Sequence, residues 1–213
     1  MRFAVGAVVA LAVSFVATSA RAGVIYHQPT GPGSGSAAAS STLNYFGFSP
    51  GFTAADDFTL ASSAMVTRVN WWGQLVAGGE DFLLTFYADA AGNPGAVLHT
   101  TGGTLSRVPA PSLGYSPAYS YSSDLATPFA AAAGTKFWLS VFNQAPDAVW
   151  AWISADADGN GERQRLNTSP TWVTGIGNTD LAFQLASVPE PMSLVLFATG
   201  IAATRLRRTR HSR

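Results

Sequence analysis

The 213-residue chain contains no cysteine. This absence excludes disulfide bonds, thiolate metal sites and cysteine nucleophiles, so the fold has to be stabilised by packing alone. Histidine is scarce as well, with only His27, His99 and His211. The lysine of a phosphate-binding P-loop, the Rossmann glycine spacing and a G-x-S-x-G nucleophile motif are all missing. We therefore expect no enzymatic activity.

Basic side chains are few in the central part of the chain. Residues 23–187 contain five basic and eleven acidic side chains, a net charge of 5 − 11 = −6, although the full chain is formally neutral. An acidic, lysine-poor surface argues against nucleic acid or anionic lipid as a partner. It is compatible with neutral polysaccharide or with divalent cations.

Residues 1–22 have the pattern of a secretory signal peptide. A short basic start, Met1-Arg2, precedes an almost wholly apolar run over 3–16, and Ala20-Arg21-Ala22 fits the small–x–small cleavage rule. We expect cleavage after Ala22, with a cut after Ala20 as the alternative. The protein would then be exported through the translocon, and this segment would take no part in the fold.

Residues 188–213 form a tail with three parts. Val188 is followed by Pro189, Glu190 and Pro191, and the two prolines favour an extended, non-helical backbone. An uncharged apolar run over 192–204 comes next, then five arginines between 205 and 213. As a helix the run and its neighbours span about 24 Å, less than the roughly 30 Å hydrocarbon core. The pattern predicts a short, marginal transmembrane helix with its arginines on the cytoplasmic side.

These three parts together resemble the PEP-CTERM sorting signal of bacterial exosortase substrates. The resemblance implies that Pro189-Glu190-Pro191 is the motif recognised by an exosortase-type processing enzyme, and that cleavage near it releases the tail. It also implies a location: tethered to the inner membrane before processing, then at the cell surface or outside the cell. Because the apolar run is short and the tail carries five of the chain's arginines, we interpret the tail as a temporary anchor.

The remaining 165 residues have the size of one domain. Within this domain we expect an N-terminal strand and a flexible Gly/Ser/Pro loop over 23–55. We expect the main body over 56–187. Period-two patterns alternate there with turn clusters, and no window has helical periodicity. The fold class we expect is all-β, a jelly-roll-like antiparallel β-sandwich of roughly eight to ten strands. The expected strands are 56–60, 65–74, 81–88, 97–101, 113–122, 136–143, 148–154 and 180–186.

This body also resembles a recurrent ectodomain of PEP-CTERM proteins. The resemblance supports the fold and the export class and implies no biochemical activity. The segments that carry it are Asp56-Asp57-Phe58, Trp71-Trp72-Gly73, Phe86-Tyr87-Ala88-Asp89, Asn93-Pro94-Gly95, Phe137-Trp138-Leu139 and Asp180-Leu181-Ala182-Phe183-Gln184.

Tryptophan is abundant in the body. Trp150 and Trp152 share one face of a predicted strand, whereas the adjacent Trp71 and Trp72 face opposite sides. If the Trp150 face is outward, these rings and Trp72 would form a platform for the sugar rings of an exopolysaccharide. The alternative is that the rings fill the core of the sandwich.

Residues 156–162 read Asp-Ala-Asp-Gly-Asn-Gly-Glu and match the first half of a calcium-binding loop. The candidate ligands are Asp156, Asp158, Asn160 and Glu162. The twelfth position of the motif is Asn167 and not the bidentate glutamate, and Asp, Asn and Gly are also ordinary turn formers. Calcium is thus a possible cofactor, and a turn-rich connection is the alternative.

The sequence therefore predicts an exported bacterial surface or extracellular-matrix protein with a structural or adhesive role, processed by a PEP-CTERM/exosortase system. The alternative is a protein similar to a carbohydrate-binding module, which recognises exopolysaccharide through exposed aromatic side chains.

Overall fold

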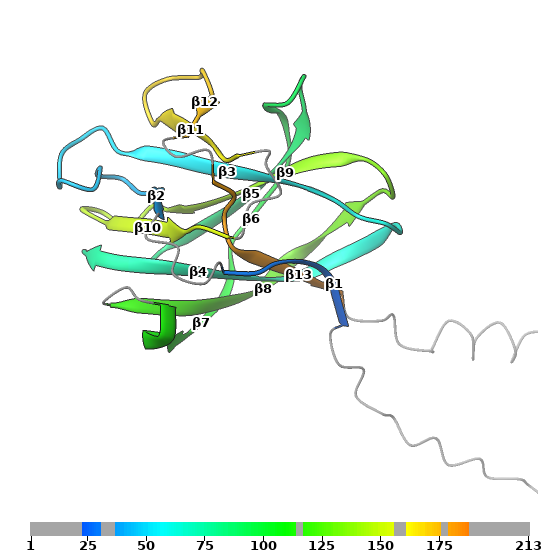
Figure 1. The fold of residues 1–213 in the computed structure, drawn as a ribbon, viewed down its shortest axis with the longest axis horizontal. Coiled ribbons are helices and arrows are strands. Elements are labelled where there is room, and N and C mark those ends of the chain that lie inside the picture. The colour runs from blue at the N-terminus through cyan, green and yellow to red at the C-terminus, as the bar shows by residue number, and fades with distance from the viewer. Residues whose placement is uncertain (1–22, 31–36, 114–116, 156–160, 176–178, 188–213) are drawn as a thin grey trace, which may run out of the picture. The chain divides into compact units, whose positions relative to one another are not determined.

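The computed structural model describes residues 23–30, 37–113, 117–155, 161–175 and 179–187 (Figure 1). This part of the chain contains thirteen strands and one short 3-10 helix, η1 (Pro111–Leu113). The strands are β1 (Gly23–Gln28), β2 (Ala37–Ala39), β3 (Phe52–Thr59), β4 (Ala64–Ala77), β5 (Phe82–Asp89), β6 (Pro94–Thr101), β7 (Gly103–Pro109), β8 (Ala118–Ala131), β9 (Lys136–Asn143), β10 (Val149–Ile153), β11 (Arg163–Leu166), β12 (Val173–Thr174) and β13 (Phe183–Ser187).

Two antiparallel sheets pack face to face, which confirms the predicted all-β sandwich. The first sheet has the order β1-β13-β4-β10-β2, and β8 joins it on the other side of β4 with β7 beyond. The second sheet has the order β12-β11-β3-β9-β5-β6. Figure 1 shows the two layers, with β3, β9, β5 and β6 in one and β4, β8, β10 and β13 in the other.

The core lies between the sheets and follows the period-two pattern of the sequence. Phe58 on β3, Leu139 on β9 and Phe183 on β13 are each 1% exposed or less, and their rings and methyl groups belong to one cluster. Alternate residues of a strand face opposite sides of a sheet, so one apolar set per strand closes this layer. The outward residues Lys136 and Thr59 remain in contact with solvent.

The strand positions agree best where the alternation is strong. Expected strand 136–143 coincides with β9, and 148–154 contains β10. The expected strand 113–122 is displaced, because β8 begins at Ala118 and continues to Ala131. Pro128 lies where the β4–β8 register shifts, between the pairs Val66↔Phe129 and Arg68↔Asp124, so its missing N–H breaks no ladder bond there. β2, β7, β11 and β12 were not predicted.

The N-terminal part of the domain is more structured than its composition indicates. The flexible Gly/Ser/Pro loop expected within 23–55 contains strand β2, which pairs with β10, and a hydrogen-bonded segment over 40–51. Ser40 and Ser41 are completely buried there, and the Ser40 hydroxyl donates to the carbonyl of Val141 at 2.6 Å. These small polar residues connect β2 to the second sheet.

The first and last strands of the body lie side by side. β1 pairs antiparallel with β13, and Gly23 lies opposite Ser187. Figure 1 shows these strand ends at one end of the body and the β2–β3 loop at the other. Within the described ranges, no helix is long and apolar enough to cross a membrane. Ala20, Ala22, Val188, Pro189, Glu190 and Pro191, together with the expected transmembrane helix, lie outside those ranges.

Candidate functional site

Trp150 and Trp152 do not form an outward platform. They share a face of β10, as expected, but that face packs against the second sheet and both side chains are 0% exposed. The Trp152 Nε1–H donates to the carbonyl of Ala182 at 2.8 Å, and the Trp150 ring lies 5.0 Å from the ring of Phe82. The predicted stacking role of these two tryptophans is therefore wrong, because β10 is an interior strand and its large side chains fill the core.

Trp72 faces the other way. It is half-buried on the outer face of the first sheet, and its ring centroid lies 6.4 Å from that of His27. Trp72 does not line the hollows described below, and its role in carbohydrate binding stays a prediction.

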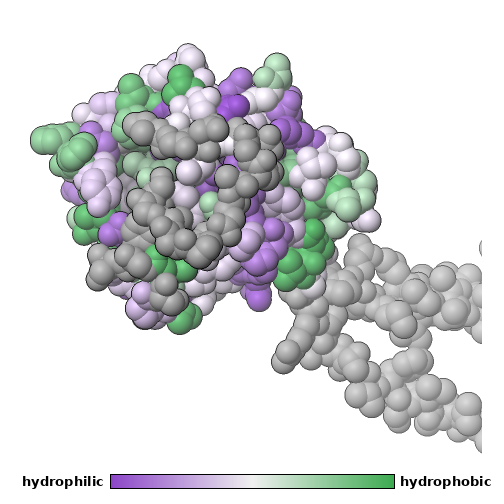
Figure 2. Space-filling view, in the orientation of Figure 1, coloured by the Kyte–Doolittle hydropathy of each residue, from purple (hydrophilic) through white to green (hydrophobic). Residues whose placement is uncertain are grey.

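The most exposed aromatic side chains lie on the loop between β2 and β3. Phe46 is 81% exposed and Phe48 69%, the two highest values among the large hydrophobic side chains of the described residues, and Tyr45 is 53% exposed. In the space-filling view, hydrophobic surface appears at the end of the body where this loop lies (Figure 2). Aromatic rings held in water on a monomer are typical of a binding surface.

Asn44 gives this aromatic loop its shape. Its Oδ1 accepts the backbone N–H groups of Phe46 and Phe48, both at 3.0 Å. Its backbone N–H donates to the carbonyl of Phe48 at 2.8 Å, and its carbonyl accepts from Gly47 at 2.9 Å. Gly47 has a φ of 80°, which favours glycine at this position. The rings are therefore presented by a backbone that is hydrogen-bonded to a single residue, Asn44.

A hollow of about 360 Å³ lies beside this loop at the edge of the sandwich. Tyr45 and Phe46 line it from the loop, Phe52 lines it from β3, and the amide side chains of Asn44 and Gln164 contribute polar groups. Ala37, Ala38, Ala39 and Glu162 complete the lining. Because β2 is an edge strand of one sheet and β11 lies beside the edge of the other, the two sheets leave this space between them.

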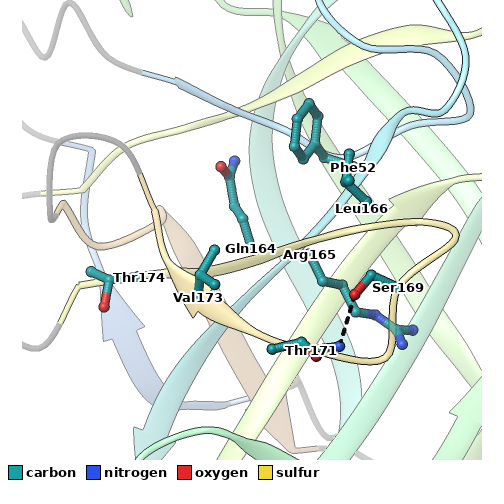
Figure 3. A pocket seen from close by; sticks show the side chains of 8 residues that line it. All are labelled: Phe52, Gln164, Arg165, Leu166, Ser169, Thr171, Val173 and Thr174. Atoms are coloured by element: carbon teal, nitrogen blue, oxygen red, sulfur yellow. Dashed lines mark hydrogen bonds between the residues drawn. The ribbon is translucent and has the colours of Figure 1, made fainter.

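A second hollow of about 300 Å³ adjoins the first (Figure 3). Phe52 and Gln164 line both, so the two spaces are neighbours; together we name them the edge groove. Figure 3 shows the Gln164 amide and the Phe52 ring on the same side of β11, whereas Arg165 extends away from them. The remaining lining residues of this hollow are Arg165, Leu166, Ser169, Thr171, Val173 and Thr174.

The charged groups around the groove are largely committed to the fold. Glu162 is 2% exposed, its Oε2 accepts the backbone N–H of Thr179 at 3.1 Å, and burial raises its pKa. Arg163 donates from Nε to Gly92 O and Asn93 Oδ1, both at 3.1 Å. Arg165 stacks on Trp172, with 4.8 Å from Cζ to the ring centroid. The groove thus combines aromatic rings, amides and hydroxyls with one buried carboxyl group.

The predicted calcium ligands are only partly described. Asp156, Asp158 and Asn160 lie outside the described residues, and the Glu162 carboxylate faces Thr179 and Gly175. Among the residues that the structure describes, no group of three or more His, Cys, Asp or Glu side chains is placed to hold a metal ion. Calcium binding at residues 156–162 stays a prediction.

Comparison with known proteins identifies no relative: no family model, no curated protein and no solved structure matches this chain.

Sequence reasoning missed the residues of the aromatic loop and of the edge groove. Tyr45, Phe46 and Phe48 lie in a segment that we interpreted from its glycine, serine and proline content as a loop. The available signal was the cluster of three aromatic residues with two turn formers in Asn44-Tyr45-Phe46-Gly47-Phe48. Gln164 had no such signal, because β11 is a four-residue strand without an apolar pattern.

Proposed function

We propose that this protein is an exported adhesive protein of the bacterial surface or extracellular matrix, and that it attaches to polysaccharide through the edge groove. One observation carries the proposal: the two most exposed aromatic side chains, Phe46 and Phe48, project from a hydrogen-bonded loop beside a hollow with amide groups. Burying a phenylalanine side chain contributes about 1.5–3 kcal/mol, so a partner that covers these rings gains affinity.

A sugar chain suits the mixture of groups in this groove. The carbon-bound hydrogens of a sugar ring form apolar faces that stack on aromatic rings, and its hydroxyls need hydrogen-bond partners at the same time. Tyr45 and Phe46 provide rings at 90° to each other, and Asn44 and Gln164 provide amides beside them. Small-molecule sites generally combine an apolar lining with a few polar groups in this way.

The export and sorting parts of the proposal rest on the sequence. Residues 1–22 would direct export, and the tail from Val188 to Arg213 would hold the protein at the inner membrane until an exosortase-type enzyme processes it. Gly23 and Ser187 lie at one end of the body, opposite the aromatic loop (Figure 1). A tether after Ser187 would therefore leave the groove at the free end. The jelly-roll connectivity, the signal peptide and the short transmembrane helix remain predictions.

Retention on insoluble polysaccharide tests the proposed function. We expect the purified protein to be retained by cellulose or chitin, and the double variant Tyr45→Ala/Phe46→Ala to bind at least about tenfold more weakly, equivalent to 1.4 kcal/mol. Val97→Ala removes an exposed apolar side chain from β6, away from the groove, and serves as the matched control. Equal retention of the double variant and the native protein would reject the groove as the site. If no polysaccharide retains the native protein, the adhesive function is wrong.

A further inference from the structure

We propose that the edge groove binds the interior of an uncharged polysaccharide chain across both hollows, and that Gln164 determines which sugars it accepts. This inference rests on the proposed adhesive function and specifies its ligand class. It concerns residues on β3, β11 and the aromatic loop, none of which was singled out from the sequence.

The edge groove extends over two adjoining hollows. Hollows of about 360 and 300 Å³ are each at the small end of ligand-binding sites, which start near 300 Å³. They meet at Phe52 and Gln164, so the lining continues on both sides of these residues. A pocket for a chain end would stop at one wall. A site that continues past its central residues suits a chain that enters at one end and leaves at the other.

Gln164 differs from three other glutamines of the body in its hydrogen bonding. Gln28, Gln144 and Gln184 all bond to other side chains, to Asp56, Asp81 and Asn70 respectively. The Gln164 side chain is half-buried and makes no hydrogen bond with the other described residues. Its amide offers two donor hydrogens and a carbonyl acceptor where the two hollows meet. A sugar hydroxyl both donates and accepts, so this amide is suited to recognise it.

The charges in and around the groove disfavour an acidic sugar chain. Glu162 lines the first hollow, and the body from 23 to 187 carries eleven acidic and five basic side chains. Arg163 is engaged by Gly92 and Asn93. The Arg165 side chain extends away from Gln164 and Phe52 (Figure 3) and stacks on Trp172. The Arg165 guanidinium, which lines the second hollow, is thus held against the fold, and the acidic body repels a uronic-acid chain, so an uncharged chain is favoured.

The test measures affinity against chain length and charge, with the purified full chain. We expect cello- or chito-oligosaccharides to bind more tightly from disaccharide to hexasaccharide, by tenfold or more, and alginate, a uronic-acid polymer, to retain no protein.

Gln164→Ala should weaken binding of the hexasaccharide about tenfold. Gln164→Glu, of the same shape but charged, should not restore binding. Leu166→Ala, in the second hollow, should weaken the hexasaccharide and leave the disaccharide unchanged. Val97→Ala is the control, and thermal unfolding shows that each variant is folded.

The outcomes separate this inference from the adhesive function. If polysaccharide retains the protein but the disaccharide binds as tightly as the hexasaccharide, or Gln164→Ala has no effect, the two-hollow site is wrong and the adhesive function stands. Equal or stronger retention on alginate would overturn the preference for an uncharged chain. If the protein instead binds lipid vesicles or forms dimers through Tyr45 and Phe46, and no polysaccharide retains it, both proposals fail.

Discussion

At the scale of single residues, the buried carboxyl group of Asp56 connects three distant segments. Its Oδ2 accepts from Gln28 Nε2 on β1 at 2.7 Å and from the backbone N–H of Leu181, just before β13. Its Oδ1 accepts the backbone N–H of Asp57 at 2.9 Å. The side chain is 1% exposed, and burial raises its pKa well above 3.8, with a further increase from the nearby Asp180 carboxyl. Asp56 therefore contributes hydrogen bonds between the sheets and has a raised pKa.

The raised pKa predicts a pH-dependent stability. The folded protein keeps the Asp56 proton over a pH interval in which the unfolded chain, with a pKa near 4, has lost it. The contribution of this proton to the free energy of unfolding should be largest below about pH 4, the unfolded pKa. It should fall as the pH rises toward the folded pKa, by at most about 1.4 kcal/mol per pH unit. Urea unfolding at a series of pH values should show a shallower decrease for Asp56→Asn. Some decrease should remain, since burial also raises the pKa of Glu162.

Asp124→Asn is the control for this titration. Asp124 is exposed and bonded to Arg68, and this bond lowers its pKa, so its stabilising effect is lost as the pH falls and not as it rises. The decrease above pH 4 should therefore be the same in Asp124→Asn as in the native protein. An unchanged slope in Asp56→Asn would show that Asp56 does not hold the proton.

At the scale of elements, β4 organises the first sheet. It pairs with β8 along most of its length, and on its other side it pairs first with β13 and then with β10. The change of partner occurs between Trp71 and Gly73. A Cβ atom on Gly73 would lie 2.3–2.5 Å from the indole ring of Trp150, so the absence of a side chain there makes room for the ring.

Replacing this glycine should therefore destabilise the sandwich. Gly73→Ala should lower the free energy of unfolding by about 1–3 kcal/mol, because the ring or the strand has to move. In a Trp150→Phe background, which lacks the contacting indole atoms, the same substitution should cost less, and urea unfolding of the four proteins measures this coupling. Gly102→Ala is the control, since nothing lies within 4 Å of a Cβ at Gly102. Equal costs in both backgrounds would show that Trp150 does not pack on Gly73.

At the scale of the whole molecule, the proposed processing would change the charge of the protein. The full chain is formally neutral, and five of its twelve basic residues lie between 205 and 213. Removal of both terminal segments would leave the acidic body, with a net charge of −6. An acidic body is repelled by anionic lipid headgroups once the basic tail is gone, which suits release from the membrane.

This proposed processing predicts a definite mature chain. Mass spectrometry of the protein isolated from the surface of the producing cells should find a chain that starts at Gly23 and ends near Pro189–Pro191. A start at Arg21 would identify the alternative cut after Ala20. The same measurement on cells without the processing enzyme is the control and should find the tail still attached. A surface protein that ends at Arg213 would contradict the proposed sorting.

Much of this architecture is already contained in the order of the residues. The period-two patterns around Phe137-Trp138-Leu139 and Trp150-Ala151-Trp152 predict strands, since alternate side chains of an extended backbone face opposite sides. The lack of cysteine and the excess of acids over bases in the body are also properties of the sequence alone. Local rules of this kind act over a few residues and need no knowledge of the rest of the chain.

Which face of each strand is inward, and what lies across from it, depends on the packing of the two sheets. Alternation places Trp150 and Trp152 together, but they are buried only because β10 lies between β4 and β2 with the second sheet over that face. The edge groove brings Phe46 near Gln164, residues more than a hundred positions apart in the chain. Such a site has no local signature, because its lining is assembled where the edges of two sheets meet.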